Sequence, residues 1–233
     1  MNCIGDGPVL GDALLEMVSM LDRRWLRITA SGVREHADLR GYCDGFLNDM
    51  VVDGRGVAYV GARNRAGDQP RDAIVRVTPD GVVSMAATRM QSPNGSVVTS
   101  DGAMLIVAET SLAALTSFEI AADGTLRDRQ IWAHVPGAHP DGICMDDDGA
   151  IWFGSPVTHE FVRVLHGGEV THRWPTPPHW AIACAIGGPD HHTFYGLVGR
   201  NSVENIVGLG GDRERDGESD ASGSVLARRL PLL

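Results

Sequence analysis

The stretch "HPDGICMDDDGAIWFGS", residues 139–155, places two short apolar runs on either side of an acidic turn that ends in Gly149. Two such runs joined by a glycine-containing turn predict a β-hairpin. In front of the first run stands Asp141, inside a Pro-Asp-Gly turn signal. One copy of the stretch does not decide whether the Asp141 carboxylate serves the turn or a functional site.

The stretch recurs along the chain. Without gaps, "DGICMDDDGAIWFG" from Asp141 aligns with "NDMVVDGRGVAYVG" from Asn48 and "NGSVVTSDGAMLIV" from Asn94. The spacings are 46 and 47 residues. Each copy begins with a carboxamide or carboxylate, continues into an apolar run, and turns at a glycine before the second run. These turn glycines are Gly56, Gly102 and Gly149.

Further copies extend the repeat over the rest of the chain. Weaker ones begin at Ala181 and near Cys3, and most copies precede a second pair of short runs, as in "AIVRVTPDGVV" and "FVRVLHGGEV". About four short strands per ~45 residues is the pattern of propeller blades. The runs are too short and too β-branched for a helical repeat. We therefore predict an all-β fold: one β-propeller domain over residues 1–233 with about five blades, and a mobile loop at 208–223.

Equivalent positions of successive blades lie at the same height and radius around a propeller axis. Asn48, Asn94 and Asp141 share one phase of the repeat, so we expect them to converge on the central channel at one face. Amide and carboxylate oxygens are hard ligands that suit Ca²⁺, Mg²⁺ or Mn²⁺. Asn and Asp are also common in turns, where they bond their own backbone. Three successive repeats with such a residue favour a site over turn chemistry alone.

The composition of the chain indicates which classes of binding partner and which cellular location to expect. The formal net charge is −10, which argues against nucleic acid or an anionic membrane surface as a partner and fits a protein that handles small molecules or cations. The four cysteines have no CxxC spacing, and Cys144 and Cys184 sit inside apolar runs, so we expect buried free thiols. No run is long enough to span a membrane, and no secretory signal is evident. We expect a cytoplasmic monomer or weak homo-oligomer.

Three stretches carry a family resemblance: "FLNDMVVDGRG" from Phe46, "SPNGSVVTSDGAMLIVAE" from Ser92 and "HPDGICMDDDGAIWF" from His139. They resemble the gluconolactonase/regucalcin (senescence marker protein) family. The resemblance runs over nearly the whole chain and weakens after about Gly199. It implies a six-bladed propeller that holds one divalent cation (Ca²⁺, Zn²⁺, Mg²⁺ or Mn²⁺) in its channel, and enzymes that hydrolyse lactones of sugars and related compounds.

The resemblance also implies roles for particular residues. Asn94 and Asp141 match the family's metal-binding Asn and Asp, and Asp141 also matches the residue given the acid/base role. Asn48 matches the Asn that faces the substrate beside the metal. The expected function is therefore a divalent-metal-dependent lactonase that acts on a small-molecule lactone.

Two departures leave an alternative open. The family's first blade supplies a metal-binding Glu from an E-x-P motif, and no E-x-P occurs in this chain, which opens at what corresponds to the second blade. Phe46 stands where many sugar lactonases carry an Arg, which disfavours a sugar-acid-like substrate. The alternative is a catalytically impaired or inactive propeller that binds a small molecule or a metal. A further reading is that the true start lies upstream of Met1.

Overall fold

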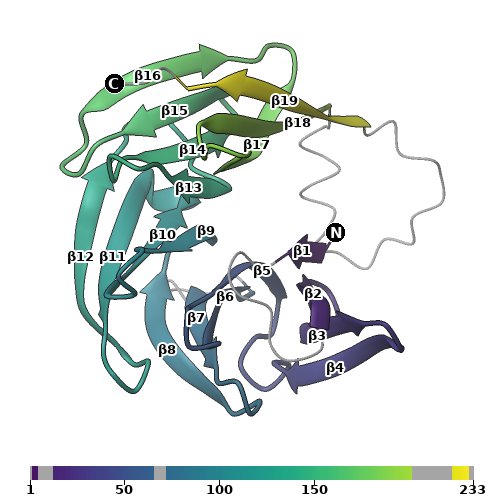
Figure 1. Ribbon diagram of the computed structural model, residues 1–233. Helices are drawn as coiled ribbons and strands as arrows, with labels where there is room; N and C mark the ends of the chain where they lie inside the picture. The colour runs from purple at the N-terminus through teal and green to yellow at the C-terminus, as the bar shows by residue number, and fades with distance from the viewer. Residues whose placement is uncertain (1, 5–12, 66–71, 201–221, 231–233) are drawn as a thin grey trace.

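The computed structural model describes residues 2–4, 13–65, 72–200 and 222–230, and side chains from residue 15 onward. Its described part is built almost entirely of short antiparallel strands that form five sheets arranged in a ring (Figure 1). The predicted all-β propeller with five blades is thus confirmed. The described residues contain one short 3₁₀ helix, η1 (Thr110–Leu112), and no helix among them is long and apolar enough to cross a bilayer.

Each blade is a meander in strand order. Blade 1 comprises β1 (Asn2–Ile4), β2 (Ala13–Ser19), β3 (Arg24–Thr29) and β4 (Gly32–Asp38); blade 2 comprises β5 (Phe46–Val52), β6 (Ala58–Arg63), β7 (Asp72–Val77) and β8 (Val83–Met90). Blade 3 comprises β9 (Pro93–Val98), β10 (Met104–Glu109), β11 (Ala114–Ile120) and β12 (Leu126–His134). Blade 4 comprises β13 (Ile143–Met145), β14 (Ile151–Ser155), β15 (Glu160–Val164) and β16 (Val170–Pro175); blade 5 comprises β17 (Trp180–Gly187), β18 (Thr193–Arg200) and β19 (Ser222–Arg229). The first strand of each blade lies towards the middle of the ring, and β4, β8, β12 and β16 lie at its outer edge (Figure 1).

Among the residues that the structure describes, the hydrophobic core forms four clusters, one between each pair of successive blades. Alternate residues of a strand point to opposite faces of its sheet, so one strand can supply two clusters. In β14, Phe153 packs into the cluster shared with blade 3, whereas the next-door Trp152 packs into the cluster shared with blade 5. In β10, Ile106 and Leu105 are divided in the same way between the neighbours of blade 3. The period-two pattern of the sequence therefore builds the ring blade by blade.

The turn glycines of the repeat have a common conformation. Gly56, Gly102 and Gly149 have φ of 81°, 70° and 76°, in the left-handed region that glycine adopts without steric cost. Their turns are also fixed by side chains: Asp146 Oδ1 accepts from the Ala150 amide at 3.0 Å. The acidic turn of the opening stretch is thus explained by turn chemistry, unlike Asp141.

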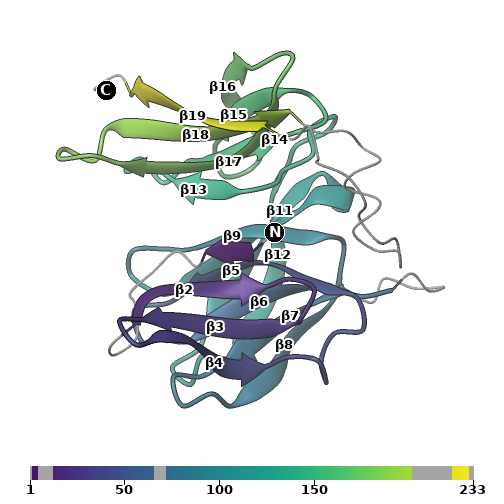
Figure 2. The ribbon, with the colours of Figure 1, turned by 90° about the vertical axis from the view of Figure 1, so that its right-hand side faces the viewer.

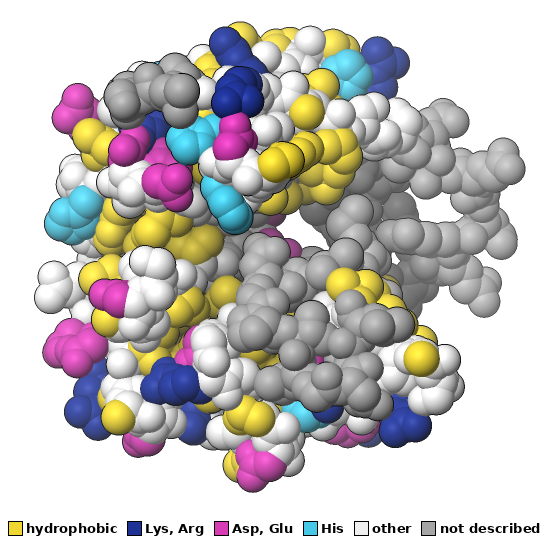
Figure 3. All heavy atoms as spheres, in the orientation of Figure 1, with side chains coloured by type: hydrophobic (Ala, Val, Ile, Leu, Met, Phe, Trp, Pro, Cys, Tyr) yellow, Lys and Arg dark blue, Asp and Glu magenta, His cyan; other side chains and the backbone are white. Residues whose placement is uncertain are grey.

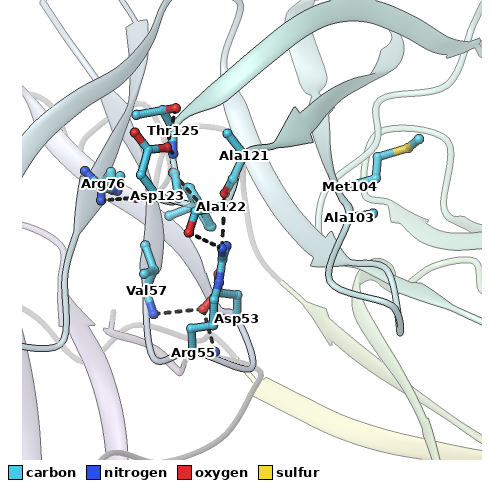
Figure 4. A network of polar contacts seen from close by, with 12 residues as sticks. Asp53, Arg55, Val57, Arg76, Ala103, Met104, Ala121, Ala122, Asp123 and Thr125 are labelled. Carbon is cyan, nitrogen blue, oxygen red and sulfur yellow. Dashed lines mark hydrogen bonds and ion pairs between the residues drawn. The ribbon is translucent and has the colours of Figure 1, made fainter.

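Polar contacts also join neighbouring blades at the turn ends (Figure 4). The buried Asp53 carboxylate pairs with Arg55 at 2.6 Å, and the Arg55 guanidinium reaches across to the carbonyls of Ala121 and Ala122 in blade 3 at 3.1 and 3.0 Å. One arginine therefore both neutralises a buried carboxylate and ties blade 2 to blade 3.

Two further sequence features find their place in the fold. Glu16, which interrupts an apolar run, is 3% exposed and lies 3.3 Å from Arg27, its cross-strand partner on β3. The predicted loop at 208–223 lies outside the described residues, except that Ser222 and Gly223 begin β19. Figure 2 views the ring from the side on which blades 1 and 5 lie.

Candidate metal centre at the start of the inner strands

The residues predicted to form the site all lie where an inner strand begins. Asn48 is the third residue of β5, Asn94 is the second residue of β9, and Asp141 stands two residues before β13. The inner strands share one direction along the channel, so these residues lie towards the same end of it.

Each of these positions is a bulge in its sheet. Asn48 and Asp49 fall between the pairs Leu47–Ala62 and Met50–Val60, so that two residues of β5 oppose one residue of β6. Asn94 and Gly95 oppose one residue of β10 in the same way. In blade 4, Gly154 exchanges backbone hydrogen bonds with Asp141 and Gly142 at 2.9 and 3.0 Å. Bulges re-aim side chains away from the regular pleat, which explains how these polar groups leave the blade interfaces.

Backbone hydrogen bonds join the bulges of neighbouring blades. The Gly95 amide donates to the Asp141 carbonyl at 3.0 Å, and the Gly142 amide donates to the Ile182 carbonyl at 2.9 Å. The parallel between these bonds makes Ile182 the equivalent position in blade 5. Blade 5 therefore places an aliphatic side chain at this phase of the repeat.

The approach of the blades requires glycine at the bulge. A Cβ on Gly95 would lie 2.5 Å from the Ile143 nitrogen and 2.6 Å from the Asp141 oxygen, both backbone atoms. A side chain at this position would force blades 3 and 4 apart beside the site.

Asn94 is held by its amide nitrogen. The Asn94 Nδ2 donates to the Thr110 hydroxyl at 3.2 Å, and that hydroxyl donates to the Pro140 carbonyl at 2.7 Å. The Asn94 Oδ1 is buried and has no hydrogen-bond partner. A buried acceptor without a partner is costly, so this oxygen is suited to a cation or a ligand donor that completes it.

Asp141 supplies the buried carboxyl group of the site. Desolvation by burial, followed by the nearby Asp49 carboxylate, raises the pKa of Asp141 well above its ordinary value, while a side-chain hydrogen bond with Asn94 acts in the opposite direction. The residue keeps partial exposure to solvent although protein surrounds its carboxyl group. A desolvated carboxyl beside a second carboxylate and an unpartnered amide oxygen has the electrostatics of a cation site.

Asn48 is connected to the same region through the backbone. Its Nδ2 donates to the Pro93 carbonyl at 3.2 Å, directly before Asn94. The structure thus joins Asn94 to Asp141 through side chains and brings Asn48 next to the backbone of Asn94. The metal-binding, catalytic and substrate-facing roles of these residues stay predictions.

Sequence reasoning missed two residues. Asp49 follows Asn48 in "FLNDM" and was not distinguished from its neighbour, although it adds the second carboxylate to the site. Thr110 lies in η1, outside the aligned positions of the repeat. Within the described ranges no three His, Cys, Asp or Glu side chains gather as a metal cluster, so amide oxygens would have to supply part of any coordination.

A cavity of about 690 Å³ lies at the other end of the inner strands, away from these residues. Its walls include Val52 at the end of β5, Asp53 directly after it, Thr99 after β9, Cys144 in β13 and Ile186 in β17. Figure 3 shows one face of the ring with a hollow near its middle, bordered above by hydrophobic side chains. The cavity and the candidate metal centre are therefore two separate features of the channel.

Comparison with known proteins gives the family. A family model described as the SMP-30/gluconolactonase/LRE-like region matches residues 16–197. Diisopropyl-fluorophosphatase of Loligo vulgaris is 37% identical over 83 residues, which is 33% of this chain and 26% of that protein, so the match spans about a quarter of the relative.

Solved structures agree on the fold. A calcium-binding regucalcin from Agrobacterium tumefaciens has a TM-score of 0.72 at 17% identity, with 88% of this chain and 70% of that chain covered. A luciferin-regenerating enzyme has a TM-score of 0.74 at 18% identity, over 98% and 78% of the two chains. A gluconolactonase from Xanthomonas campestris has a TM-score of 0.54 at 20% identity, over 78% of each chain. Because the family model matches most of the sequence, the chain belongs to the SMP-30/gluconolactonase/LRE-like family.

Proposed function

We propose that this propeller hydrolyses lactones, with one divalent cation held by Asn94 and Asp141 and with Asn48 beside the bound substrate. The observation that carries the proposal is the buried, unpartnered Oδ1 of Asn94 next to the desolvated carboxyl of Asp141. Family membership supports this reaction class, that of lactonases and related hydrolases.

The donor set fits a hard divalent cation. The Asn94 Oδ1 lacks a hydrogen-bond partner, and the raised pKa of Asp141 shows that its site disfavours an uncompensated negative charge. When bound there, such a cation supplies Lewis-acid polarisation of a lactone carbonyl. Asp49 adds a second carboxylate to the region, and we propose that it contributes the negative charge that the absent E-x-P Glu provides elsewhere in the family.

The chain's own residues would transfer the proton and orient the substrate. Asp141, ionised where a bound cation compensates its charge, takes a proton from the water that attacks the lactone carbonyl carbon, and returns it to the ring oxygen as the ester C–O bond breaks. The product is the open hydroxy acid. Asn48 would orient the substrate from the next blade, held by its bond to the Pro93 carbonyl. Thr110 keeps the Asn94 oxygen directed away from the protein's own donors.

A second candidate is a binding protein that keeps the site without turnover. The observation that favours it is that the described residues bring only two acidic side chains to the centre, with no cluster of three potential anionic or imidazole ligands. Such a site could hold a cation or a small molecule weakly and lack the charge needed for rapid hydrolysis.

The deciding experiment combines binding with turnover. Protein stripped with a chelator is titrated with Ca²⁺ and Mn²⁺ by calorimetry, and hydrolysis is followed on a panel of polar and apolar lactones plus one organophosphate triester. Stoichiometric cation binding with cation-dependent lactone hydrolysis supports the proposal. Cation binding without turnover on any panel member supports the second candidate, and the absence of cation binding contradicts the proposed metal-dependent hydrolysis.

A further inference from the structure

Two cysteines on the inner strands of adjacent blades have their sulfur atoms close together. The Cys144 Sγ in β13 lies 3.4 Å from the Cys184 Sγ in β17. The backbone explains the match, because Gly142 donates to the Ile182 carbonyl at 2.9 Å. Two residues further along both strands come Cys144 and Cys184, at the same height and on the same side.

The two thiols differ in access. Cys144 is half-buried and lines the cavity of about 690 Å³, so a small molecule in that cavity can reach its sulfur. Cys184 is 8% exposed, and its thiol donates to the Trp152 carbonyl at 3.3 Å. The buried thiol is thus placed behind the accessible one, as a resolving group would be.

We propose that Cys144 and Cys184 form a dithiol modification site that closes into a disulfide between blades 4 and 5. The S–S bond is about 2.05 Å, so the two sulfurs need to approach by little more than 1 Å, a shift that small side-chain rotations can supply. The oxidant is a low-molecular-weight disulfide that enters the cavity.

The reaction proceeds by two thiol–disulfide exchanges. The Cys144 thiolate attacks one sulfur of the small disulfide, forms a mixed disulfide and releases one small thiolate. The Cys184 sulfur then attacks the Cys144 sulfur, forms the Cys144–Cys184 bond and releases the second small thiolate. The two protons of the cysteines go to the two released thiolates through solvent, and the two electrons pass from the protein to the small disulfide.

The bond would link blades 4 and 5 beside Asp141, the residue of the candidate metal centre that lies closest to this interface in sequence. Asp141 precedes Cys144 by three residues, and its neighbour Gly142 makes the hydrogen bond to blade 5. A disulfide here fixes the spacing of blades 4 and 5 next to Asp141. This consequence is independent of whether the proposed hydrolysis occurs.

The test uses a small neutral oxidant on the folded chain of 233 residues. Bis(2-hydroxyethyl) disulfide is chosen because a neutral oxidant is not repelled by the exposed Asp101 carboxylate at the cavity. The background carries Cys3→Ser, and Cys43 serves as an internal control because its thiol is buried and burial raises its pKa. Thiol counting and peptide mass spectrometry follow the reaction.

We expect loss of two thiols, a linked pair of peptides containing Cys144 and Cys184, and a thermal midpoint raised by about 5 °C or more, reversed by dithiothreitol. In Cys184→Ser, the reaction should stop at a mixed disulfide on Cys144; in Cys144→Ser, Cys184 should stay reduced. A stable mixed disulfide on Cys144 with Cys184 present would overturn the proposal, as would unreacted Cys144 in both proteins.

Discussion

The amide nitrogen of Asn94 donates to the Thr110 hydroxyl at 3.2 Å, and the same hydroxyl donates at 2.7 Å to the carbonyl of Pro140, the residue before Asp141. Thr110 thus bridges Asn94 and the residue that precedes Asp141. It fixes which end of the Asn94 carboxamide remains free of protein partners, so it acts as a positioning residue.

We predict that Thr110→Val weakens Ca²⁺ or Mn²⁺ binding by about tenfold or more, because valine keeps the shape but cannot accept from Asn94. Thr110→Ser keeps the hydroxyl and should bind within about twofold of the wild type. Calorimetric titration of chelator-stripped protein measures both. Equal affinity of the valine variant and the wild type would remove Thr110 from the site.

The proposed chemistry depends on the Asp141 carboxylate. Asp141→Asn should lower kcat/KM for any hydrolysed lactone by about 100-fold or more even at saturating cation, because the amide cannot take a proton from water. Asp101→Asn is the matched control, since Asp101 is an exposed turn carboxylate at the opposite end of the channel. Turnover that survives in Asp141→Asn would mean that another group is the base.

Close packing at the bulge predicts a specific cost for Gly95→Ala. The new Cβ would meet backbone atoms of blade 4 at 2.5–2.6 Å, which we expect to cost about 1–3 kcal/mol of unfolding free energy and about 3–10 °C in thermal midpoint. Gly54→Ala is the control, because a Cβ there meets nothing within 4 Å. Calorimetric scans of the two variants should differ clearly; similar midpoints would show that blades 3 and 4 separate easily.

The buried hydroxyl of Tyr59 should make the folded state less stable at alkaline pH. Its side chain is 1% exposed and its hydroxyl donates to the Gly124 carbonyl at 2.9 Å; burial first, and then the Asp53 carboxylate, raises its pKa to about 12. Because the folded pKa exceeds the unfolded value of about 10, the folded state binds more protons between these pH values. The associated stability, on the order of 2 kcal/mol, is fully present below pH 10 and is lost as pH rises towards 12.

We expect Tyr59→Phe to cost about 1 kcal/mol near neutral pH through the lost hydrogen bond, and to show a flatter decline above pH 10. Urea unfolding at a series of pH values measures this. Tyr195→Phe, at a residue 37% exposed, is the control. Parallel alkaline declines in the wild type and Tyr59→Phe would contradict the assignment.

The repeat in the sequence predicted the ring because the turn glycines and the alternating apolar residues act locally. Gly56, Gly102 and Gly149 have the positive φ that such turns require, and the spacing of Asn48, Asn94 and Asp141 put all three at strand starts. These features follow from two repeats in the sequence: apolar residues alternate every two residues within a strand, and whole blades recur about every 46 residues along the chain.

What escaped prediction depends on contacts between blades. A bulge adds a residue without changing residue types, so the sequence did not reveal that blade 5 places Ile182 at the ligand phase or that Asp49 joins the site. The proximity of Cys144 and Cys184 is likewise a property of two strands 40 residues apart. Apolar context predicted that these thiols would be shielded, not that they would meet.

The division of the core into four inter-blade clusters bears on how the ring opens. Blades 2, 3 and 4 each contribute to two of the described clusters, whereas blades 1 and 5 each contribute to one. A nearest-neighbour assembly of this kind loses its structure from the units with the fewest neighbours. Amide hydrogen exchange should therefore be fastest in the terminal blades and slowest in β10, whose residues are shared between both faces of blade 3. Local unfolding of blade 5 would break the hydrogen bond between Gly142 and Ile182. Because Gly142 follows Asp141 directly, motion of blade 5 would change the position of the Asp141 carboxyl group.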